Sequence, residues 1–290
     1  RGGFSRASIG VQDINAKVQE AIGRRQSFDE TKRAIELCRA AGIGSINVDL
    51  MYGLPQQTEE SVAATVGEVM KLCPDRLAVF GYAHMPQRFR HQGLIRGDLL
   101  PNTLERFAQA SEIARRVTAA GYQRIGIDHY VRPDDPLVTG TARRNFQGYT
   151  TDGATALIGL GASAIGRLPQ GYVQNATATA DYARRISERG VATVRGRALT
   201  LDDRVRAHVI ERLMCDLAFD RNELVDRFGD AATPVIDEAD ALVTSGCNGL
   251  VEAAEQGFRI TEPGRPFART VCAAFDAYLD RGASRYSAGI

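Results

Sequence analysis

The sequence predicts an α/β fold, in which a parallel sheet covered by helices is followed by a smaller helical domain. In residues 1–131, short β-branched segments alternate with amphipathic helical patterns, as in strands joined by crossover helices. Residues 132–199 are polar and rich in glycine, and residues 200–290 return to helical patterns. Because 290 residues suffice for one large and one smaller domain, we predict these three ranges as the parts of the chain.

Four segments of the first part are short and rich in β-branched or aromatic residues, which is the composition of strands. They are residues 4–12, 45–53, 76–84 and 123–131. We expect all four to lie in one parallel sheet.

Three amphipathic helices are expected between these strands, over residues 27–41, 59–72 and 103–119. The first opens with the capping box Ser27-x-x-Glu30, and the third follows Asn102, a favoured N-cap residue. Only about three strand–helix units precede residue 120, whereas a closed barrel needs eight. We therefore expect a partial barrel, with further strands upstream of the chain.

The last part resembles a winged-helix module in its order of elements. Helices are expected from Thr200, from Asp220, over 232–245 and over 265–282, with a strand, turn and strand in 249–261. Another helical pattern covers 178–189. In a chain of balanced charge we expect this module to cover an active site rather than to bind DNA.

Charge and composition exclude several classes of protein. Lys and Arg number 36 against 35 Asp and Glu, so no long-range field attracts a phosphate backbone and no nucleic-acid partner is expected. No apolar run approaches the roughly 20 residues that span a bilayer, and the N-terminal residues do not resemble a signal peptide. We expect a cytoplasmic monomer without a membrane partner.

The cysteine and histidine residues predict no metal site within the chain. The five cysteines are scattered, and most lie in apolar helical patterns as buried reduced thiols do. The four histidines show no HxH or HxxxH spacing. His129 lies among acidic, aromatic and basic residues, yet a structural role explains it as well.

Polar residues near the ends of the predicted strands are the candidate site. Gln12 ends one strand, Asp49 ends the run INVD, and Ala83 lies near the end of the third strand. In parallel barrels these ends face the catalytic mouth. Arg24 follows Gln12 by twelve residues, and its planar fork suits a ligand carboxylate. The alternative is that Gln12 and Asp49 are turn or capping residues and that Arg24 is a solvated surface charge.

The segment GLGASA (159–164) imitates a dinucleotide-binding fingerprint. It follows no clear strand and precedes no helix, so a tight sheet turn or a close approach to a flat ligand explains its glycines better.

Six runs of the sequence carry a family resemblance. They are SIGVQDIN (8–15), SINVDLMYGLPQQT (45–58), DRLAVFGYAHMP (75–86), GIDHYVRPDD (126–135), RRNFQGYTT (143–151) and LIGLGASAIG (157–166). In this order they resemble the oxygen-independent coproporphyrinogen III oxidases of the radical S-adenosylmethionine superfamily, over essentially the whole chain. The first runs are shared with a related heme-chaperone family, whereas DHYVRPDD and RRNFQGYTT favour the oxidases.

The resemblance implies the C-terminal part of a partial (β/α)6 radical-SAM barrel with a helical, winged-helix-like C-terminal domain. It implies two S-adenosylmethionine molecules, one [4Fe-4S] cluster and an electron donor protein. The implied reaction is the oxidative decarboxylation of two propionates of coproporphyrinogen III to vinyl groups, which gives protoporphyrinogen IX in heme biosynthesis.

Five positions match S-adenosylmethionine contacts of that family. Gln12, Arg24, Asp49 and Ala83 match the second cofactor molecule, and Ile165 matches the first. We expect the side chains of Gln12, Arg24 and Asp49 to converge on one concavity.

Arg143, Arg144 and Tyr149 are expected to contact substrate propionates, because of their charge and their place in the run RRNFQGYTT. The family's CxxxCxxC cluster motif is not found in these 290 residues, so we expect this chain by itself to be inactive. Two alternatives remain: a non-catalytic heme-binding or heme-chaperone relative, which RRNFQGYTT argues against, and an unrelated barrel enzyme using Asp49 and His129 as acid and base.

Overall fold

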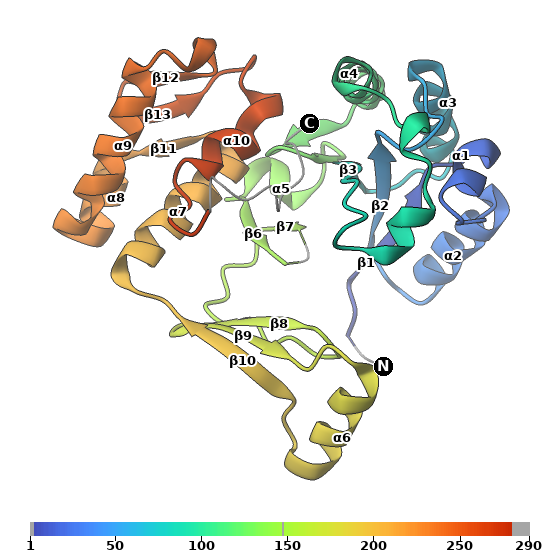
Figure 1. The fold of residues 1–290 in the computed structure, drawn as a ribbon, viewed down its shortest axis with the longest axis horizontal. Helices are drawn as coiled ribbons and strands as arrows, with labels where there is room; N and C mark the ends of the chain where they lie inside the picture. The colour runs from blue at the N-terminus through green and yellow to red at the C-terminus, as the bar shows by residue number, and fades with distance from the viewer. Residues whose placement is uncertain (1–2, 147, 280–290) are drawn as a thin grey trace. The chain divides into compact units, whose positions relative to one another are not determined.

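A computed structural model describes residues 3–146 and 148–279. They fall into two compact units, one up to Gly140 and the other over Thr141–Tyr278 (Figure 1). The division into 1–131, 132–199 and 200–290 stays a prediction. Among the helices of the described residues, none is both long and apolar enough to cross a membrane.

A five-stranded sheet forms the centre of the first unit, with the strand order β1-β2-β3-β5-β4. The strands are β1 (Arg6–Gln12), β2 (Ser45–Tyr52), β3 (Arg76–Gly81), β4 (Gln123–Ile125) and β5 (His129–Val131). The first three strands pair in parallel, as the sequence predicted.

The fourth predicted strand, residues 123–131, is wrong as a single parallel strand. The chain turns back at Gly126, whose φ of 55° lies in the left-handed region that glycine enters without steric cost. The two halves become β4 and β5, which pair with each other antiparallel, and β5 also pairs antiparallel with β3.

Helices follow the strands where the capping signals place them. The helical elements of this unit are α1 (Ala16–Ala21), α2 (Phe28–Ala40), α3 (Glu59–Met70), η1 (Arg90–Leu94), η2 (Gly97–Leu99), α4 (Thr103–Ala119) and α5 (Pro136–Thr139). The capping box predicted at Ser27 is formed, and Asn102, the predicted N-cap of α4, forms a capping box with Glu105.

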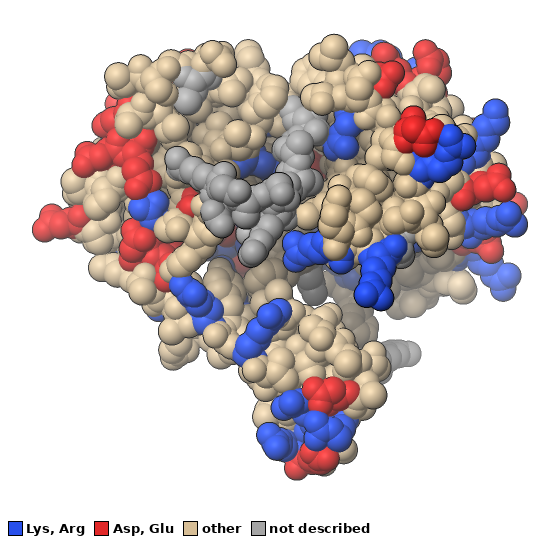
Figure 2. Space-filling view, in the orientation of Figure 1, with Lys and Arg blue, Asp and Glu red and all other residues tan. Residues whose placement is uncertain are grey.

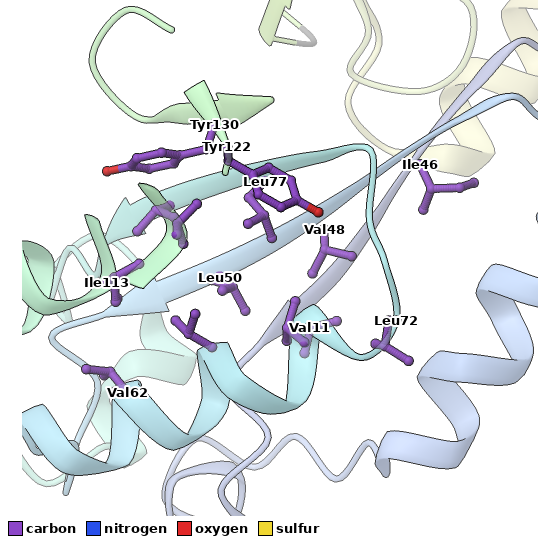
Figure 3. Packing of buried hydrophobic residues seen from close by; sticks show 14 of the residues in the cluster. Val11, Ile46, Val48, Leu50, Val62, Leu72, Leu77, Ile113, Tyr122 and Tyr130 are labelled. Carbon is purple, nitrogen blue, oxygen red and sulfur yellow. The ribbon is translucent and has the colours of Figure 1, made fainter. Parts of the chain in front are cut away.

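The hydrophobic core of the first unit lies between the sheet and helices α2, α3 and α4 (Figure 3). Val48 and Leu50 of β2 and Leu77 of β3 are at most 1% exposed. Burying a side chain of this size stabilises the fold by about 1.5–3 kcal/mol. Because side chains alternate along a strand, Asn47 and Asp49 of β2 face the opposite side of the sheet.

The second unit begins with a hairpin and a small antiparallel sheet. The hairpin pairs β6 (Arg143–Asn145) with β7 (Gly148–Thr150). The sheet has the order β10-β9-β8 and contains β8 (Ile165–Leu168), β9 (Gly171–Asn175) and β10 (Thr193–Ala198). Helix α6 (Thr179–Arg189) confirms the helical pattern near 178–189. None of these strands was predicted from the sequence. In β10 the reason is that all six residues are exposed and show no apolar alternation.

The remainder of the second unit confirms the helices and the hairpin of the predicted module. Its helical elements are α7 (Leu201–Asp216), α8 (Arg221–Phe228), η3 (Gly229–Ala232), α9 (Thr233–Thr244), η4 (Cys247–Gly249), η5 (Arg265–Phe267) and α10 (Ala268–Ala273). Its strands are β11 (Ala218–Asp220), β12 (Val251–Ala254) and β13 (Gly257–Ile260), in the order β11-β13-β12. The predicted helix over 265–282 is shorter than expected, since α10 ends at Ala273, and residues 280–282 lie outside the described residues.

Acidic side chains gather over α8 and α9 on the face that Figure 2 shows. Asp220, Glu223 and Asp226 lie together at α8. Arg227 lies beside them. The expectation that this module does not bind DNA stays a prediction.

A buried carboxylate fastens the end of β1 to the helices beside it. Asp13 is 0% exposed and accepts hydrogen bonds from Oγ1 of Thr65 at 2.6 Å and from Nε2 of Gln57 at 2.5 Å. It also accepts the backbone N–H of Asn15 at 2.7 Å, and Asn15 is the N-cap of α1. One side chain therefore joins β1, α1 and α3.

Asp13→Asn is expected to destabilise the protein, because an amide NH2 group would replace an acceptor that three donors face. We expect a loss of about 1–3 kcal/mol in the free energy of unfolding, measured by urea denaturation. The control is Asp134→Asn, whose side chain is 75% exposed and pairs only with Arg132 among the described residues. Equal losses in the two variants would contradict the importance of this network.

Two cysteine thiols of the second unit are held in their protonated form. Burial raises the pKa of Cys215 to about 12 and that of Cys272 to about 12. Because the thiolate is the reactive form, iodoacetamide at pH 8 should alkylate the exposed Cys73 well before these two. Mass spectrometry of peptides would measure the rates, and the same reaction in urea provides the unfolded reference. Alkylation of Cys215 as fast as of Cys73 in the folded protein would contradict this.

Candidate functional site

Gln12 ends β1 in a conformation that is costly for a residue with a side chain. Its φ is 69°, and the register of β1 against β2 shifts between Gly10 and Gln12. A left-handed residue other than glycine costs about 1–2 kcal/mol. The side-chain oxygen Oε1 is buried and has no hydrogen-bond partner within the described residues. Strain and an unpaired acceptor at one residue are typical of a ligand site.

Arg24 reaches back over the end of β1 from beyond helix α1. Its Nη2 donates to the carbonyl oxygen of Gly10 at 2.5 Å and to Oε1 of Gln26 at 3.0 Å. The residue is otherwise exposed to solvent. Its guanidinium group is therefore positioned by the protein and still has donors for a ligand.

Asp49 was expected at the end of a strand, but it lies within β2. The strand continues three residues further, to Tyr52. Both carboxylate oxygens accept from Oγ of Ser8 at 3.0 Å, and Oδ1 also accepts from Nδ2 of Asn47 at 2.6 Å. These contacts fix the carboxylate on the side of the sheet that faces away from the core.

Gln12, Arg24 and Asp49 converge on this polar face of the sheet. Gly10 and Asp49 are register partners, so their Cβ directions point to the same side. A Cβ atom on Gly10 would lie 2.7 Å from Nε2 of Gln12 and 3.6 Å from Nη2 of Arg24. A larger residue at position 10 would therefore displace the end of the Gln12 side chain from its present position. The role of the three residues as cofactor ligands stays a prediction.

Ser8 and Asn47 belong to the same polar face, and the sequence analysis missed both. Oδ1 of Asn47 is a second buried acceptor without a partner in the described part of the chain. Their spacing of two residues from Gly10 and from Asp49 was the available signal, because such residues share one face of a strand.

Ala83 lies two residues beyond β3, near the carboxyl end of that strand. Its carbonyl oxygen accepts from Nε2 of Gln92 at 3.1 Å. The oxygen can accept one further hydrogen bond, so a backbone contact of Ala83 with a ligand is compatible with this arrangement.

His129 and Asp49 do not form an acid–base pair. They lie two strands apart, because β3 separates β2 from β5. That separation is about 10 Å, given the usual spacing of strands. His129 is 6% exposed, and its Nδ1 lies 2.7 Å from Oδ1 of Asp128. The structural role considered for His129 fits these contacts better than ordinary acid–base chemistry with Asp49.

Arg143 and Arg144 line a cavity of about 430 Å³ in the second unit. Arg167 and Tyr172, which the sequence analysis did not single out, line it as well. Tyr149 is not among the lining residues. It is 3% exposed, and its hydroxyl donates to the carbonyl oxygen of Met214 at 2.7 Å. This contact ties the β6–β7 hairpin to α7 and gives Tyr149 a structural role.

Ile165 is the first residue of β8, and glycines allow the preceding chain to lie close to it. A Cβ atom on Gly166 would lie 2.8 Å from the carbonyl oxygen of Leu157, and one on Gly159 would lie 3.0 Å from that of Ile165. Close backbone packing therefore explains Gly159 of GLGASA, whereas Gly161 has a φ of 105°, which favours glycine. A strand, β8, rather than a helix follows this segment. The contact of Ile165 with a cofactor stays a prediction.

The described residues do not fit an iron–sulfur cluster. Among them, no three His, Cys, Asp or Glu side chains lie together as metal ligands would.

Comparison with known proteins agrees with the resemblance stated above. Residues 1–69 match the radical SAM superfamily. An oxygen-independent coproporphyrinogen III oxidase of Bradyrhizobium diazoefficiens is 44% identical over 99% of the chain, and one of Salmonella typhimurium is 42% identical over 96%. The chain covers 65% of the length of the first relative and 62% of the second.

A solved structure extends the agreement to the fold. Coproporphyrinogen III oxidase (HemN) from Escherichia coli, described as a radical SAM enzyme, superposes with a TM-score of 0.87 at 40% identity. The match covers 96% of this chain and 65% of that protein. By sequence and by fold, this chain is a homologue of the oxygen-independent coproporphyrinogen III oxidases over nearly its whole length.

Proposed function

We propose that the protein to which this chain belongs is an oxygen-independent coproporphyrinogen III oxidase. It would convert two propionates of coproporphyrinogen III to vinyl groups with loss of CO₂, which yields protoporphyrinogen IX for heme synthesis. The names of the relatives and the HemN fold support this reaction over a heme-binding or heme-chaperone role.

The polar face of the sheet is the observation that carries the proposal. Gln12 and Asn47 each present a buried oxygen without a partner among the described residues, and Arg24 and Asp49 add opposite charges beside them. S-adenosylmethionine carries an ammonium, a carboxylate, ribose hydroxyls and an adenine amine, so its donors and acceptors fit this set. When bound beside a reduced cluster, the cofactor supplies a carbon radical able to take a hydrogen atom from an unactivated C–H bond.

Each residue then has a distinct task in binding. Arg24 would form a two-point contact with the carboxylate of the methionine moiety. Asp49 would accept from the ammonium group or the ribose hydroxyls, and Oε1 of Gln12 would accept a further donor. Ala83 would supply a backbone contact and Ile165 an apolar contact. The family resemblance assigns the first four residues to a second cofactor molecule and Ile165 to the first.

Of the two arginines predicted from the sequence, Arg143 is the proposed substrate contact, since its guanidinium group can pair with a propionate carboxylate. Arg144, whose Nη1 lies 2.7 Å from the sulfur of Met214, would position the hairpin. Tyr149 would act through the position of the hairpin, because its hydroxyl is already bonded. We assign no residue of this chain as a cluster ligand. An electron donor protein, a cytoplasmic location and a monomeric state complete the proposal.

Arg24→Ala is expected to weaken S-adenosylmethionine binding by about tenfold or more, because a charged hydrogen-bond donor to the cofactor carboxylate is lost. Isothermal titration of the 290-residue chain measures this without a cluster. Asp49→Asn should weaken binding as well, while both variants keep the unfolding temperature within a few degrees.

The matched control is Arg33→Ala on the exposed face of α2, which should bind the cofactor as the wild type does. If both Arg24→Ala and Asp49→Asn bind the cofactor with unchanged affinity, the cofactor does not bind at this face of the sheet. Coproporphyrinogen oxidation, assayed anaerobically in a protein that also carries a reconstituted cluster, should fall in the same two variants.

A further inference from the structure

We infer that the cavity of the second unit is a binding site for the carboxylates of an amphipathic ring compound, with Arg143 and Arg167 as the carboxylate-binding residues. The inference rests on the proposed function and deepens it, because it specifies where propionate groups would be held. Its evidence lies entirely within Thr141–Tyr278.

The charge of the cavity wall favours an anionic ligand. Three guanidinium groups line it, from Arg143, Arg144 and Arg167, against the single carboxylate of Asp152. That carboxylate accepts the backbone N–H of Ala154 at 2.8 Å and forms no ion pair within the described residues. Positive groups that are half removed from water without counter-charges are unfavourable, and a bound anion relieves this cost.

The three arginines differ in how far the protein already occupies them. Arg143 is half-buried, and its guanidinium group has no hydrogen-bond or ion-pair partner among the described residues. Arg167 makes one long hydrogen bond, at 3.3 Å, to the carbonyl oxygen of Ala154. Both therefore keep the paired donors that match a carboxylate.

Arg144 is fixed by its neighbours instead. Its Nη1 lies 2.7 Å from the sulfur of Met214, and its carbon Cζ lies 5.6 Å from the ring centre of Tyr149. Its backbone N–H donates to Glu211 at 3.0 Å. We therefore assign Arg144 to the structure of the hairpin, and Arg143 and Arg167 to the ligand.

The remaining wall suits the edge of an apolar ring. Phe146 is 55% exposed and meets Tyr172 edge to face, with ring centres 5.8 Å apart. Leu157 adds aliphatic surface. A volume of about 430 Å³ lies within the range of small-molecule sites and would hold part of a tetrapyrrole with its carboxylates. The combination of aromatic wall and arginines distinguishes this ligand class from inorganic phosphate.

The test uses coproporphyrin III, the air-stable and fluorescent oxidised form of the substrate, which carries the same four propionates. Its binding to the 290-residue chain would be followed by fluorescence titration at two salt concentrations. Arg143→Gln/Arg167→Gln should weaken binding by about tenfold or more and lower its salt dependence. Arg143→Lys/Arg167→Lys keeps the positive charges but lacks the paired donors of the guanidinium group. Its affinity for coproporphyrin III should lie between those of the Gln double variant and the wild type.

Arg189→Gln, which removes one positive charge from an exposed position on α6, is the control and should bind within twofold of the wild type. The inference is overturned if the wild-type chain does not bind coproporphyrin III. It is also overturned if the Gln double variant binds equally well, or if Arg189→Gln weakens binding as much. Circular dichroism and thermal melting identify unfolded variants, and the Lys double variant then decides.

S-adenosylmethionine titrations on the same proteins separate this inference from the proposed function. If cofactor binding depends on Arg24 but porphyrin binding does not depend on Arg143 and Arg167, only the assignment of the cavity as a carboxylate site is overturned. Arginine-dependent porphyrin binding without any cofactor binding would overturn the proposed function and leave the cavity as a carboxylate site.

Discussion

The buried carboxylate of Asp13 is the constraint on which the arrangement of the first unit depends. Its donors come from α3 and from the cap of α1, so the end of β1 cannot move independently of either helix. The link continues through Gln19, whose Nε2 donates to the carbonyl oxygens of Asp13 and Gln26. Gln26 in turn accepts from Arg24. A network of buried polar side chains therefore holds Arg24 against the strand. Its cost is the buried carboxylate of Asp13, which would be left without a hydrogen bond if a donor were lost.

The features that were predicted correctly from the sequence are those that local interactions determine. The caps at Ser27 and Asn102 act within one helical turn, so the helix starts were readable from the residues themselves. The run 123–131 misled because its β-rich composition hides a single glycine, and only the left-handed φ of Gly126 reverses the chain. The strand β10 was invisible for the opposite reason, since its exposed residues carry no apolar pattern.

The residues of the candidate site also fall into two groups, those identified from the sequence and those that only the fold revealed. Strand ends and the family resemblance identified Gln12, Arg24 and Asp49, which the sheet brings to one face. Ser8 and Asn47 required the register between β1 and β2, and Arg167 and Tyr172 required the pairing of β8 with β9. Tyr149 was predicted to contact the substrate from its place in the loop. Only the fold reveals that its hydroxyl donates to a backbone carbonyl in α7.

The reversal at Gly126 also has a steric consequence for the polar face. After β3 the sheet continues through an antiparallel return instead of another crossover unit, so on that side the parallel series stops. Eight-stranded barrels fill their interior with layers of side chains, which leaves only the mouth for a ligand. A sheet that does not close into a barrel leaves one face open, so a bulky molecule can lie along its strands. The place where the parallel series ends beside this face is therefore set by where one glycine turns the chain.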